Sequence, residues 1–140
     1  MKIEDAFEQY AKFLQNLRPE NIPELEKFVH SEVVFRDPFH EVKGAEAMSN
    51  VISQMFNNLT EVNFTVCDHA IAKDKVFFDW RLEAVLAGKP WVVVGVTILK
   101  YSANYKIIEH AEHWDSASQF YERFPIIGPL IRYFRYRISK

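Results

Sequence analysis

The segment from Phe35 to His40 holds the residue types in this chain that are best suited to chemistry. Asp37 and His40 place a carboxylate and an imidazole among aromatic side chains, directly after an apolar run. Pro38 lacks a backbone donor and pushes the preceding residue out of helical geometry, which predicts a strand that ends in a fixed turn. A carboxylate that apolar surface shields from water holds a proton more tightly and can act as a general base. The structural alternative is that Asp37 caps its own turn, as Asp before Pro often does.

Further polar side chains fall on one face of predicted strands. His110, Glu112 and Trp114 alternate along the last strand, while Thr97 and Trp80 lie on the two strands before it. If these faces point towards the helices, they enclose a mostly apolar cavity with a few convergent polar groups, which is the usual form of a small-molecule site. Each residue also has a structural explanation: a strand histidine can be a satisfied core residue, threonine is a normal strand former, and tryptophan fills cores.

Metal or cofactor chemistry is not expected. His40, His110 and Glu112 have side chains that metals bind, but they lack the short spacing of helical metal motifs. The sequence has no glycine-rich phosphate loop, and its one cysteine, Cys67, cannot form a zinc-type cluster. We therefore expect a site that needs no cofactor.

Helical periodicity describes much of the first half of the chain. Apolar residues recur at helical spacing from residue 3 onward, and Tyr10 lies on this stripe. A later helix carries Phe56 on its apolar side. The predicted elements are a helix over 3–17, a short helix from Ile22, a strand over 33–36 and a helix that follows Gly44 and ends near Asn57-Asn58.

The following residues read as strands joined by tight turns, over 62–72, 76–86, 91–101 and 106–114. Leu82 shares a face with Trp80, and strict alternation places Ile107 on the face opposite His110. The strand 91–101 is apolar at nearly every position, which implies cover on both of its faces. Helices segregated from an antiparallel meander predict an α+β fold, with the helices covering one face of a curved sheet.

This order of elements resembles the nuclear transport factor 2-like superfamily, and within it the SnoaL-like and ketosteroid isomerase-like proteins. The resemblance covers residues 3 to about 118 and is carried by the helix around Tyr10, Val34–His40 with Val42-Lys43-Gly44, Trp91–Tyr101 and His110–Asp115. It implies a cone-shaped, strongly curved mixed or antiparallel sheet wrapped around the N-terminal helices, with an apolar pocket between them. It also implies a homodimer formed through the outer face of the sheet.

The resemblance suggests roles for particular side chains. Asp37 matches the general base of ketosteroid isomerases, and Tyr10 matches their oxyanion-stabilising tyrosine. Thr97 stands where those enzymes have a protonated aspartate, and a threonine hydroxyl stabilises an enolate less because it is a weaker acid. We expect Asp37, Tyr10 and His110 to be catalytic. We expect the ligand to contact His40, Phe39, Phe56, Trp80, Leu82, Thr97, Glu112 and Trp114.

The residues from 123 onward form a separate unit. We divide the chain into a cone domain, 1–122, and a basic amphipathic C-terminal helix, 123–140, packed on or beside it. Its apolar stripe is Leu130, Ile131, Phe134 and Ile138, with arginines around it. Such a helix is typical of proteins that bind anionic membrane surfaces. The alternative is packing over the mouth of the cone or against a partner subunit.

Charge and composition restrict the remaining function classes. The first 122 residues hold 12 basic and 19 acidic side chains, so they offer no cluster of cations for nucleic acid. No stretch approaches the roughly 20 apolar residues that span a bilayer. The acidic start differs from a secretory signal, and a lone cysteine suits a reducing compartment. The expected location is the cytoplasm.

Three functions agree with these observations. The first is a cofactor-independent isomerase, cyclase or hydrolase that acts on a small apolar carbonyl compound, epoxide or polyketide-like ring. The second is a carrier or sensor of a lipid-like molecule, which needs the pocket but no proton transfer. The third is a membrane-peripheral interaction module that uses the C-terminal helix. The sequence favours binding of a small apolar molecule, with acid–base chemistry centred on Asp37.

Overall fold

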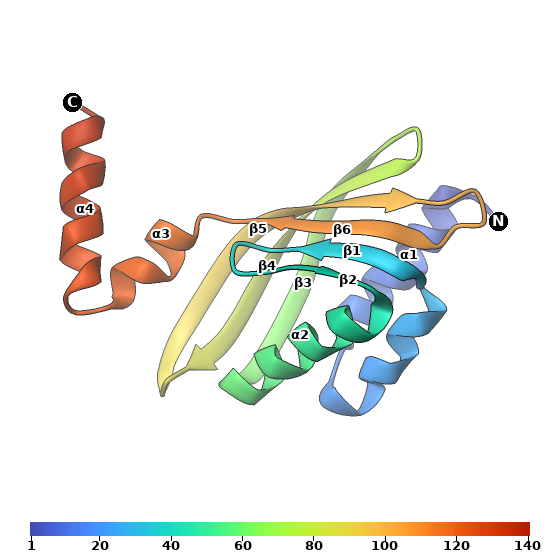
Figure 1. Cartoon of the computed structure of the whole chain (residues 1–140), viewed down its shortest axis with the longest axis horizontal. Coiled ribbons are helices and arrows are strands. Elements are labelled where there is room, and N and C mark those ends of the chain that lie inside the picture. The colour runs from blue at the N-terminus through green and yellow to red at the C-terminus, as the bar shows by residue number, and fades with distance from the viewer.

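A six-stranded sheet, in the order β2-β1-β6-β5-β4-β3, organises the chain in the computed structural model, which describes residues 1–140 (Figure 1). Its strands are β1 (Val29–Arg36), β2 (Glu41–Lys43), β3 (Leu59–Ala72), β4 (Lys75–Leu86), β5 (Lys89–Tyr101) and β6 (Ile107–His113). β1 pairs with β6 in parallel, and the other neighbours are antiparallel. The sheet is strongly curved and does not close.

Three helices cover the concave face of this sheet, and the remaining ones follow β6. The first group is α1 (Ile3–Gln15), the 3₁₀ helix η1 (Pro19–Lys27) and α2 (Ala45–Asn58). The second group is α3 (Ser116–Gln119), the 3₁₀ helix η2 (Tyr121–Arg123) and α4 (Ile127–Ile138), and Figure 1 shows α4 standing away from the sheet. The predicted α+β fold, with helices on one face of a curved sheet, is confirmed. None of the helices is long and apolar enough to span a membrane.

The helix α1 packs the predicted stripe against the sheet. Phe7, Tyr10 and Leu14 are buried, and so are Ala6 and Phe13, which widen the buried face. At its start, the backbone N–H of Lys2 donates to the Asp5 carboxylate at 2.9 Å, which satisfies one of the donors that a helix N-terminus leaves free. The helix therefore holds Tyr10 fully inside the cone.

Alternation along β4 follows the sequence prediction. Phe78, Trp80 and Leu82 are buried on the inner face, whereas the side chains between them are exposed. On β5 the outer face carries Val92, Val94 and Val96, which keep 41–51% of their surface exposed. The expected cover on both faces of β5 is therefore not met within one chain.

Several boundaries differ from the sequence prediction for local reasons. η1 begins at Pro19 because proline suits the first turn of a helix, where its missing N–H is not needed. Pro129 lies inside the first turn of α4 for the same reason, so α4 begins at Ile127. The strand β2 has three residues, too few for a periodic pattern, and was not predicted.

A register shift in β6 corrects the face predicted for Ile107. Lys100 pairs with Glu109, but Tyr101 pairs with Ile107, so Ile108 is an extra residue on β6. A bulge of this kind re-aims the side chains on one side of it. Ile107 and His110 are consequently both buried, although strict alternation places them on opposite faces.

Candidate functional site

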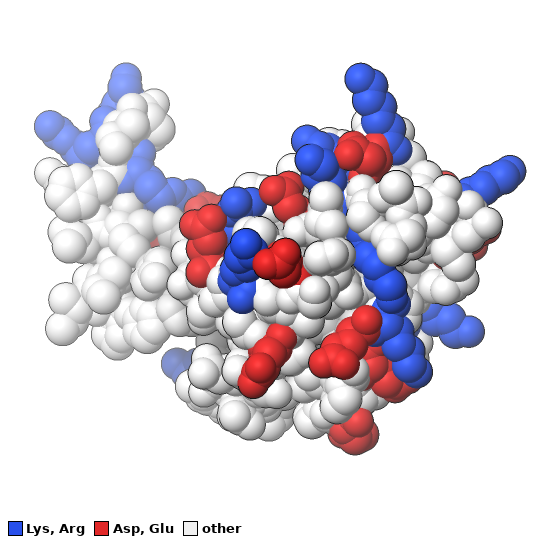
Figure 2. All heavy atoms as spheres, turned by 45° about the vertical axis from the view of Figure 1, so that its right-hand side comes forward, with Lys and Arg blue, Asp and Glu red and all other residues white.

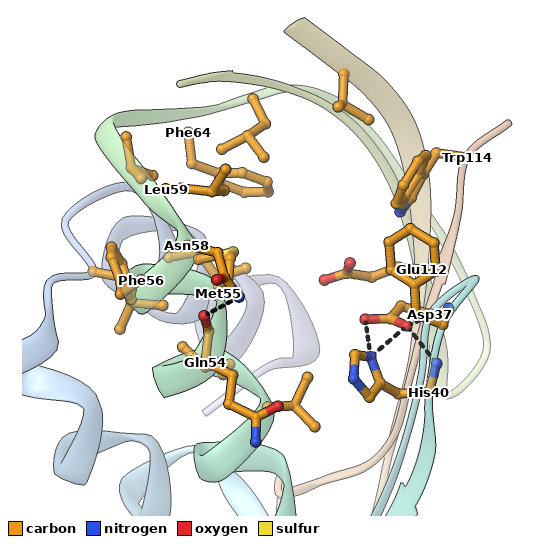
Figure 3. A pocket seen from close by; sticks show the side chains of 18 of the residues that line it. Asp37, His40, Gln54, Met55, Phe56, Asn58, Leu59, Phe64, Glu112 and Trp114 are labelled. Carbon is orange, nitrogen blue, oxygen red and sulfur yellow. Dashed lines mark hydrogen bonds and ion pairs between the residues drawn. The ribbon is translucent and has the colours of Figure 1, made fainter. Parts of the chain in front are cut away.

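A cavity of about 770 Å³ lies between α2 and the concave face of the sheet. Hydrophobic residues make up 23 of the 32 that line it, so the cavity suits the binding of an apolar molecule. Figure 3 shows Asp37, His40 and Glu112 on one side of this cavity, and Met55, Phe56 and Asn58 on the other. Every side chain proposed from the sequence lines it: Tyr10, Asp37, Phe39, His40, Phe56, Trp80, Leu82, Thr97, His110, Glu112 and Trp114.

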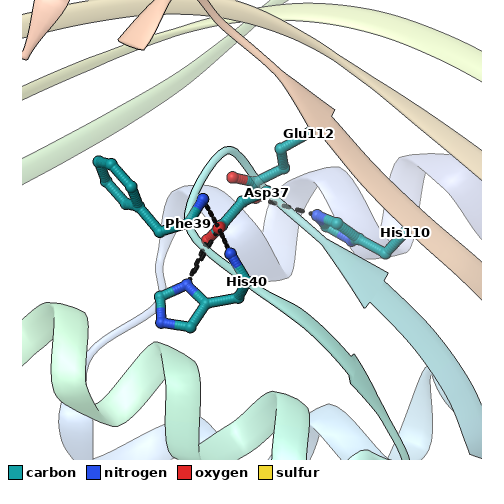
Figure 4. Close-up of polar contacts among 5 residues, drawn as sticks. All are labelled: Asp37, Phe39, His40, His110 and Glu112. Atoms are coloured by element: carbon teal, nitrogen blue, oxygen red, sulfur yellow. Dashed lines mark hydrogen bonds and ion pairs between the residues drawn. The ribbon is translucent and has the colours of Figure 1, made fainter.

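Asp37 lies in the turn between β1 and β2, and its carboxylate organises that turn. Its Oδ1 accepts hydrogen bonds from the backbone N–H groups of Phe39 and His40, both at 2.7 Å (Figure 4). The Nδ1 of His40 lies 3.0 Å from Oδ1 and 3.2 Å from Oδ2. The side chain is only 13% exposed. Asp37 thus caps its own turn and also lines the cavity, so the two readings of this residue are compatible.

A chain of hydrogen bonds links Tyr10 to Glu112 through His110. The Tyr10 hydroxyl lies 2.9 Å from His110 Nδ1, and His110 Nε2 lies 3.0 Å from a Glu112 oxygen. Burial, with smaller contributions from Tyr101 and Glu112, holds the pKa of Tyr10 well above its ordinary value, so the phenol keeps its proton. With neutral His110, the phenol therefore donates to Nδ1 and the Nε2–H group donates to Glu112.

Thr97 and Trp80 form a second polar contact inside the cone. The indole Nε1–H group of Trp80 donates to the Thr97 hydroxyl oxygen at 2.8 Å, and both residues are buried. This leaves the Thr97 hydroxyl hydrogen able to donate elsewhere. The Trp80 ring passes over Gly95 on the neighbouring strand, and a Cβ atom at this position would lie 2.6 Å from Trp80 Cζ2. Glycine at 95 therefore makes room for the tryptophan.

Aromatic rings form the wall beside the turn of Asp37. Phe39 makes edge contacts with Trp114 and Phe120, at ring distances of 5.4 and 5.0 Å. Phe120 and Tyr121 also line the cavity but were not proposed from the sequence. They follow the last strand in a segment without clear periodicity, so only their aromatic character could have signalled a role.

Polar residues at the end of α2 were also missed. Gln54, Asn57 and Asn58 line the cavity opposite the carboxylates, together with Arg18 from the segment between α1 and η1. Asn58 donates its side-chain N–H to the Gln54 carbonyl at 3.0 Å, within the last turn of the helix. In the sequence these amides resemble the polar residues that commonly end a helix, so their position in the cavity could not be predicted.

The cavity has no metal-binding geometry. His40, His110 and Glu112 do not form a cluster, and nowhere do three or more His, Cys, Asp or Glu side chains gather as a metal site would require. Two hydrogen-bonded groups lie there instead, Asp37 with His40, and Tyr10 with His110 and Glu112. What the arrangement can do chemically is accept or donate protons inside an apolar space.

Comparison of the fold with solved structures finds many similar chains of low sequence identity. An NTF2-like protein of unknown function from Burkholderia pseudomallei has a TM-score of 0.73 and 10% identity, covering 84% of this chain and 95% of that one. TerC, solved with polyporic acid, has a TM-score of 0.71 and 12% identity, covering 83% and 93%. An epoxide hydrolase from M. tuberculosis has a TM-score of 0.67 and 12% identity, covering 84% and 81%.

At these identities the solved structures establish the fold and not the reaction. No curated protein matches the chain. The model of one protein family, the SnoaL-like domain, matches residues 10–110, which run from the second half of α1 to the middle of β6. The sequence resemblance is thereby confirmed: the chain belongs to the family of SnoaL-like domains and has the NTF2-like cone fold.

Proposed function

We propose that the cavity binds a small apolar molecule and that Asp37 moves a proton of this ligand. The observation that carries the proposal is the position of the Asp37 carboxylate, which is fixed by its own turn in the wall of a mostly apolar cavity. A base held rigidly in a dry site needs little rearrangement before proton transfer. The substrate class is a carbonyl compound, an epoxide or a polyketide-like ring.

The neighbouring groups divide into donors and acceptors for such a reaction. With a ketone bound, Asp37 takes a proton from the carbon next to the carbonyl, and the electron pair moves onto the oxygen. Thr97 is the group with a free hydroxyl hydrogen to stabilise that oxygen. Tyr10 gives its hydrogen to His110, so in this proposal Tyr10 and His110 hold Glu112 in position. Return of the proton from Asp37 to another carbon completes an isomerisation. If that proton first exchanges with water, delivery of the new proton to the original carbon completes a hydrogen exchange.

The similar structures support this class of chemistry. One is an epoxide hydrolase, and another was solved with polyporic acid in the crystal. Both share the cone fold with this chain. An apolar interior with a few polar groups is what such ligands require.

A non-catalytic carrier is the second candidate, and one observation favours it. The hydrogen bonds to Asp37 from its own turn account for a carboxylate at this position without any chemistry. A carrier would use the same cavity but would not move a proton.

The test is hydrogen–deuterium exchange into 2-tetralone, an apolar cyclic ketone with acidic protons, followed by NMR in heavy water. The wild-type protein should accelerate exchange over buffer. Asp37→Asn should reduce this acceleration at least about a hundredfold, since an amide cannot accept the proton. The amide oxygen can still accept the backbone hydrogen bonds, so the turn should persist.

Asp115→Asn is the matched control. Asp115 also caps a turn through its side chain, by accepting from the Ala117 backbone N–H at 3.2 Å, but it lies outside the cavity. Fluorescence of the apolar dye 1-anilinonaphthalene-8-sulfonate reports whether each variant keeps its cavity. If all three proteins bind the dye and none accelerates exchange, the domain is a carrier and the acid–base proposal is wrong.

We also propose that the protein forms a homodimer through the outer face of β5. Val92, Val94 and Val96 form a continuous exposed apolar strip on that face. Burial against a second copy would remove this strip from water. The cover that the sequence of β5 implies would then come from the partner subunit.

A further inference from the structure

The helix α4 presents an apolar stripe that nothing in the chain covers. Ile127, Leu130 and Phe134 keep 47–54% of their surface exposed, and Ile138 keeps 85%. These residues recur at helical spacing, so they lie along one side of α4. No residue after Tyr121 lines the cavity, so the stripe does not close the cone.

What holds α4 in place uses a different side of the helix. Gly128 packs so closely on the backbone of Glu122 that no side chain would fit there. Arg132 donates to the Glu122 carbonyl at 3.0 Å, and Arg135 pairs with the Glu122 carboxylate. These contacts anchor the first part of α4 to η2, and the stripe faces elsewhere.

Positive charge surrounds the stripe. Residues 123–140 contain Arg123, Arg132, Arg135, Arg137 and Lys140 and no acidic residue. Because successive residues lie about 100° apart around a helix, Arg135 and Arg137 lie on opposite flanks of the line through Ile127, Phe134 and Ile138. In Figure 2 the upper end of the projecting helix carries blue side chains, whereas blue and red alternate over the body of the protein.

We propose that α4 docks on the surface of an anionic membrane, with its axis in the plane of the bilayer. The stripe would enter the boundary between headgroups and acyl chains, and the flanking Arg137 would meet lipid phosphates. Tyr133 is also more than half exposed and has the amphipathic ring that favours this boundary. A second copy of the chain is a poorer occupant for the stripe, since two α4 helices side by side would bring like charges together.

The body of the protein favours docking through α4 alone. Its 122 residues carry more acidic than basic side chains, so an anionic surface repels the cone and attracts the helix. Figure 1 shows that α4 projects from the cone beyond η2, which leaves the stripe accessible to a flat surface. This inference is independent of any chemistry in the cavity.

The experiment is flotation of the full-length protein with vesicles of phosphatidylcholine that contain phosphatidylglycerol, compared with vesicles of phosphatidylcholine alone. We expect binding to the anionic vesicles and a steep loss of binding as salt is raised. Leu130→Gln with Phe134→Gln should lower the binding constant at least about tenfold. Arg137→Gln with Lys140→Gln should lower it about fivefold for each charge removed.

Two controls separate docking from general effects. Tyr136→Gln changes an exposed ring on the side of α4 opposite the stripe, and Lys27→Gln with Lys43→Gln removes exposed cations from the body. Both should bind at least half as well as wild type, and thermal unfolding should be the same for all proteins. Absence of flotation, equal flotation with neutral vesicles, or flotation that the stripe variants leave unchanged would each overturn the proposal. So would sedimentation showing that the stripe variants dissociate an oligomer without any effect on vesicles.

Discussion

Asp37 has two carboxylate oxygens with different surroundings. Oδ1 accepts hydrogen bonds from the backbone and from His40, whereas Oδ2 has only the His40 imidazole within reach, at 3.2 Å. One side chain can therefore fix the turn and still offer an oxygen to a ligand. The sequence predicted a reactive residue type at position 37, but it could not predict that the two carboxylate oxygens have different hydrogen-bond partners.

The buried phenols give a residue-scale prediction about pH. Burial raises the pKa of Tyr101, and mainly burial raises that of Tyr10, from an ordinary value of 10.0. Both groups bind their protons more tightly when folded, so their contribution to stability is complete below pH 10 and is lost as the pH rises above it. Urea unfolding between pH 7 and pH 11 should show a constant free energy that falls only in the alkaline range.

Replacing each tyrosine by phenylalanine should have opposite effects at neutral pH. The Tyr101 hydroxyl is buried without a partner, so Tyr101→Phe should be neutral or stabilising by about 1 kcal/mol, and it should reduce the alkaline loss of stability. Tyr10→Phe leaves His110 Nδ1 without its donor and should destabilise the protein by about 1–3 kcal/mol. If both variants changed the free energy of unfolding equally, the assignment of these hydroxyls would be incorrect.

At the residue scale, the sequence could not predict which side chains form hydrogen bonds across long sequence separations. The side chains of Asp37, Thr97, His110 and Glu112 were recognisable as candidates from residue type and position, whereas Tyr10 became one through the family resemblance. The hydrogen bond between Tyr10 and His110 joins residues 100 positions apart, and nothing local indicates it. The expected role of Tyr10 came from the family resemblance, and its actual partner came only from the fold.

At the scale of elements, periodicity predicted most of what the structure contains. The long helices and strands have strong patterns, and their predicted ends lie close to the observed ones, apart from β1, which starts at Val29. The exceptions are features that have no period. A bulge at Ile108 adds one residue to β6, and β2 is too short to alternate. The bulge matters for the site because it lets Ile107 fill the core while His110 still points inward.

Gly95 connects two strands in a way that can be tested. A methyl group at this position would meet Trp80 Cζ2 at 2.6 Å and the His113 carbonyl oxygen at 2.8 Å. Gly95→Ala should therefore displace the Trp80 ring and cost about 1–3 kcal/mol. Gly88→Ala is the comparison, since Gly88 has a φ of 77° but open space around it.

Both glycine variants should lose stability, but only one should disturb the cavity. Gly95→Ala should shift the tryptophan fluorescence and weaken dye binding, because Trp80 lines the cavity and bonds to Thr97. Gly88→Ala should lower the melting temperature with an unchanged emission spectrum. A normal spectrum and normal dye binding in Gly95→Ala would contradict the close packing described above.

At the scale of the whole molecule, the sequence predicts that both faces of β5 are covered, but the outer face of β5 is not covered within one chain. Its valines stay 41–51% exposed, although the sequence implies cover. If a second copy supplies that cover, sedimentation velocity at micromolar concentration should show a dimer. Replacing Val92, Val94 and Val96 by threonine keeps their shape and strand preference and should yield a monomer. The single variant Glu61→Gln, on an edge strand, should remain dimeric, and a wild-type monomer would refute the dimer.

The parallel pairing of β1 with β6 has a consequence for how this protein acquires its site. β6 lies between β1 and β5 in the sheet. It therefore connects β1 and β2, from the first third of the chain, to the meander β3-β4-β5. Asp37 and Glu112 line one cavity only when β6 has docked beside β1. Pairing across such a sequence separation is slow compared with hairpin formation. During refolding the cavity walls should therefore mature before the polar groups come together, and a growing chain should complete its candidate site only after its final strand has been made.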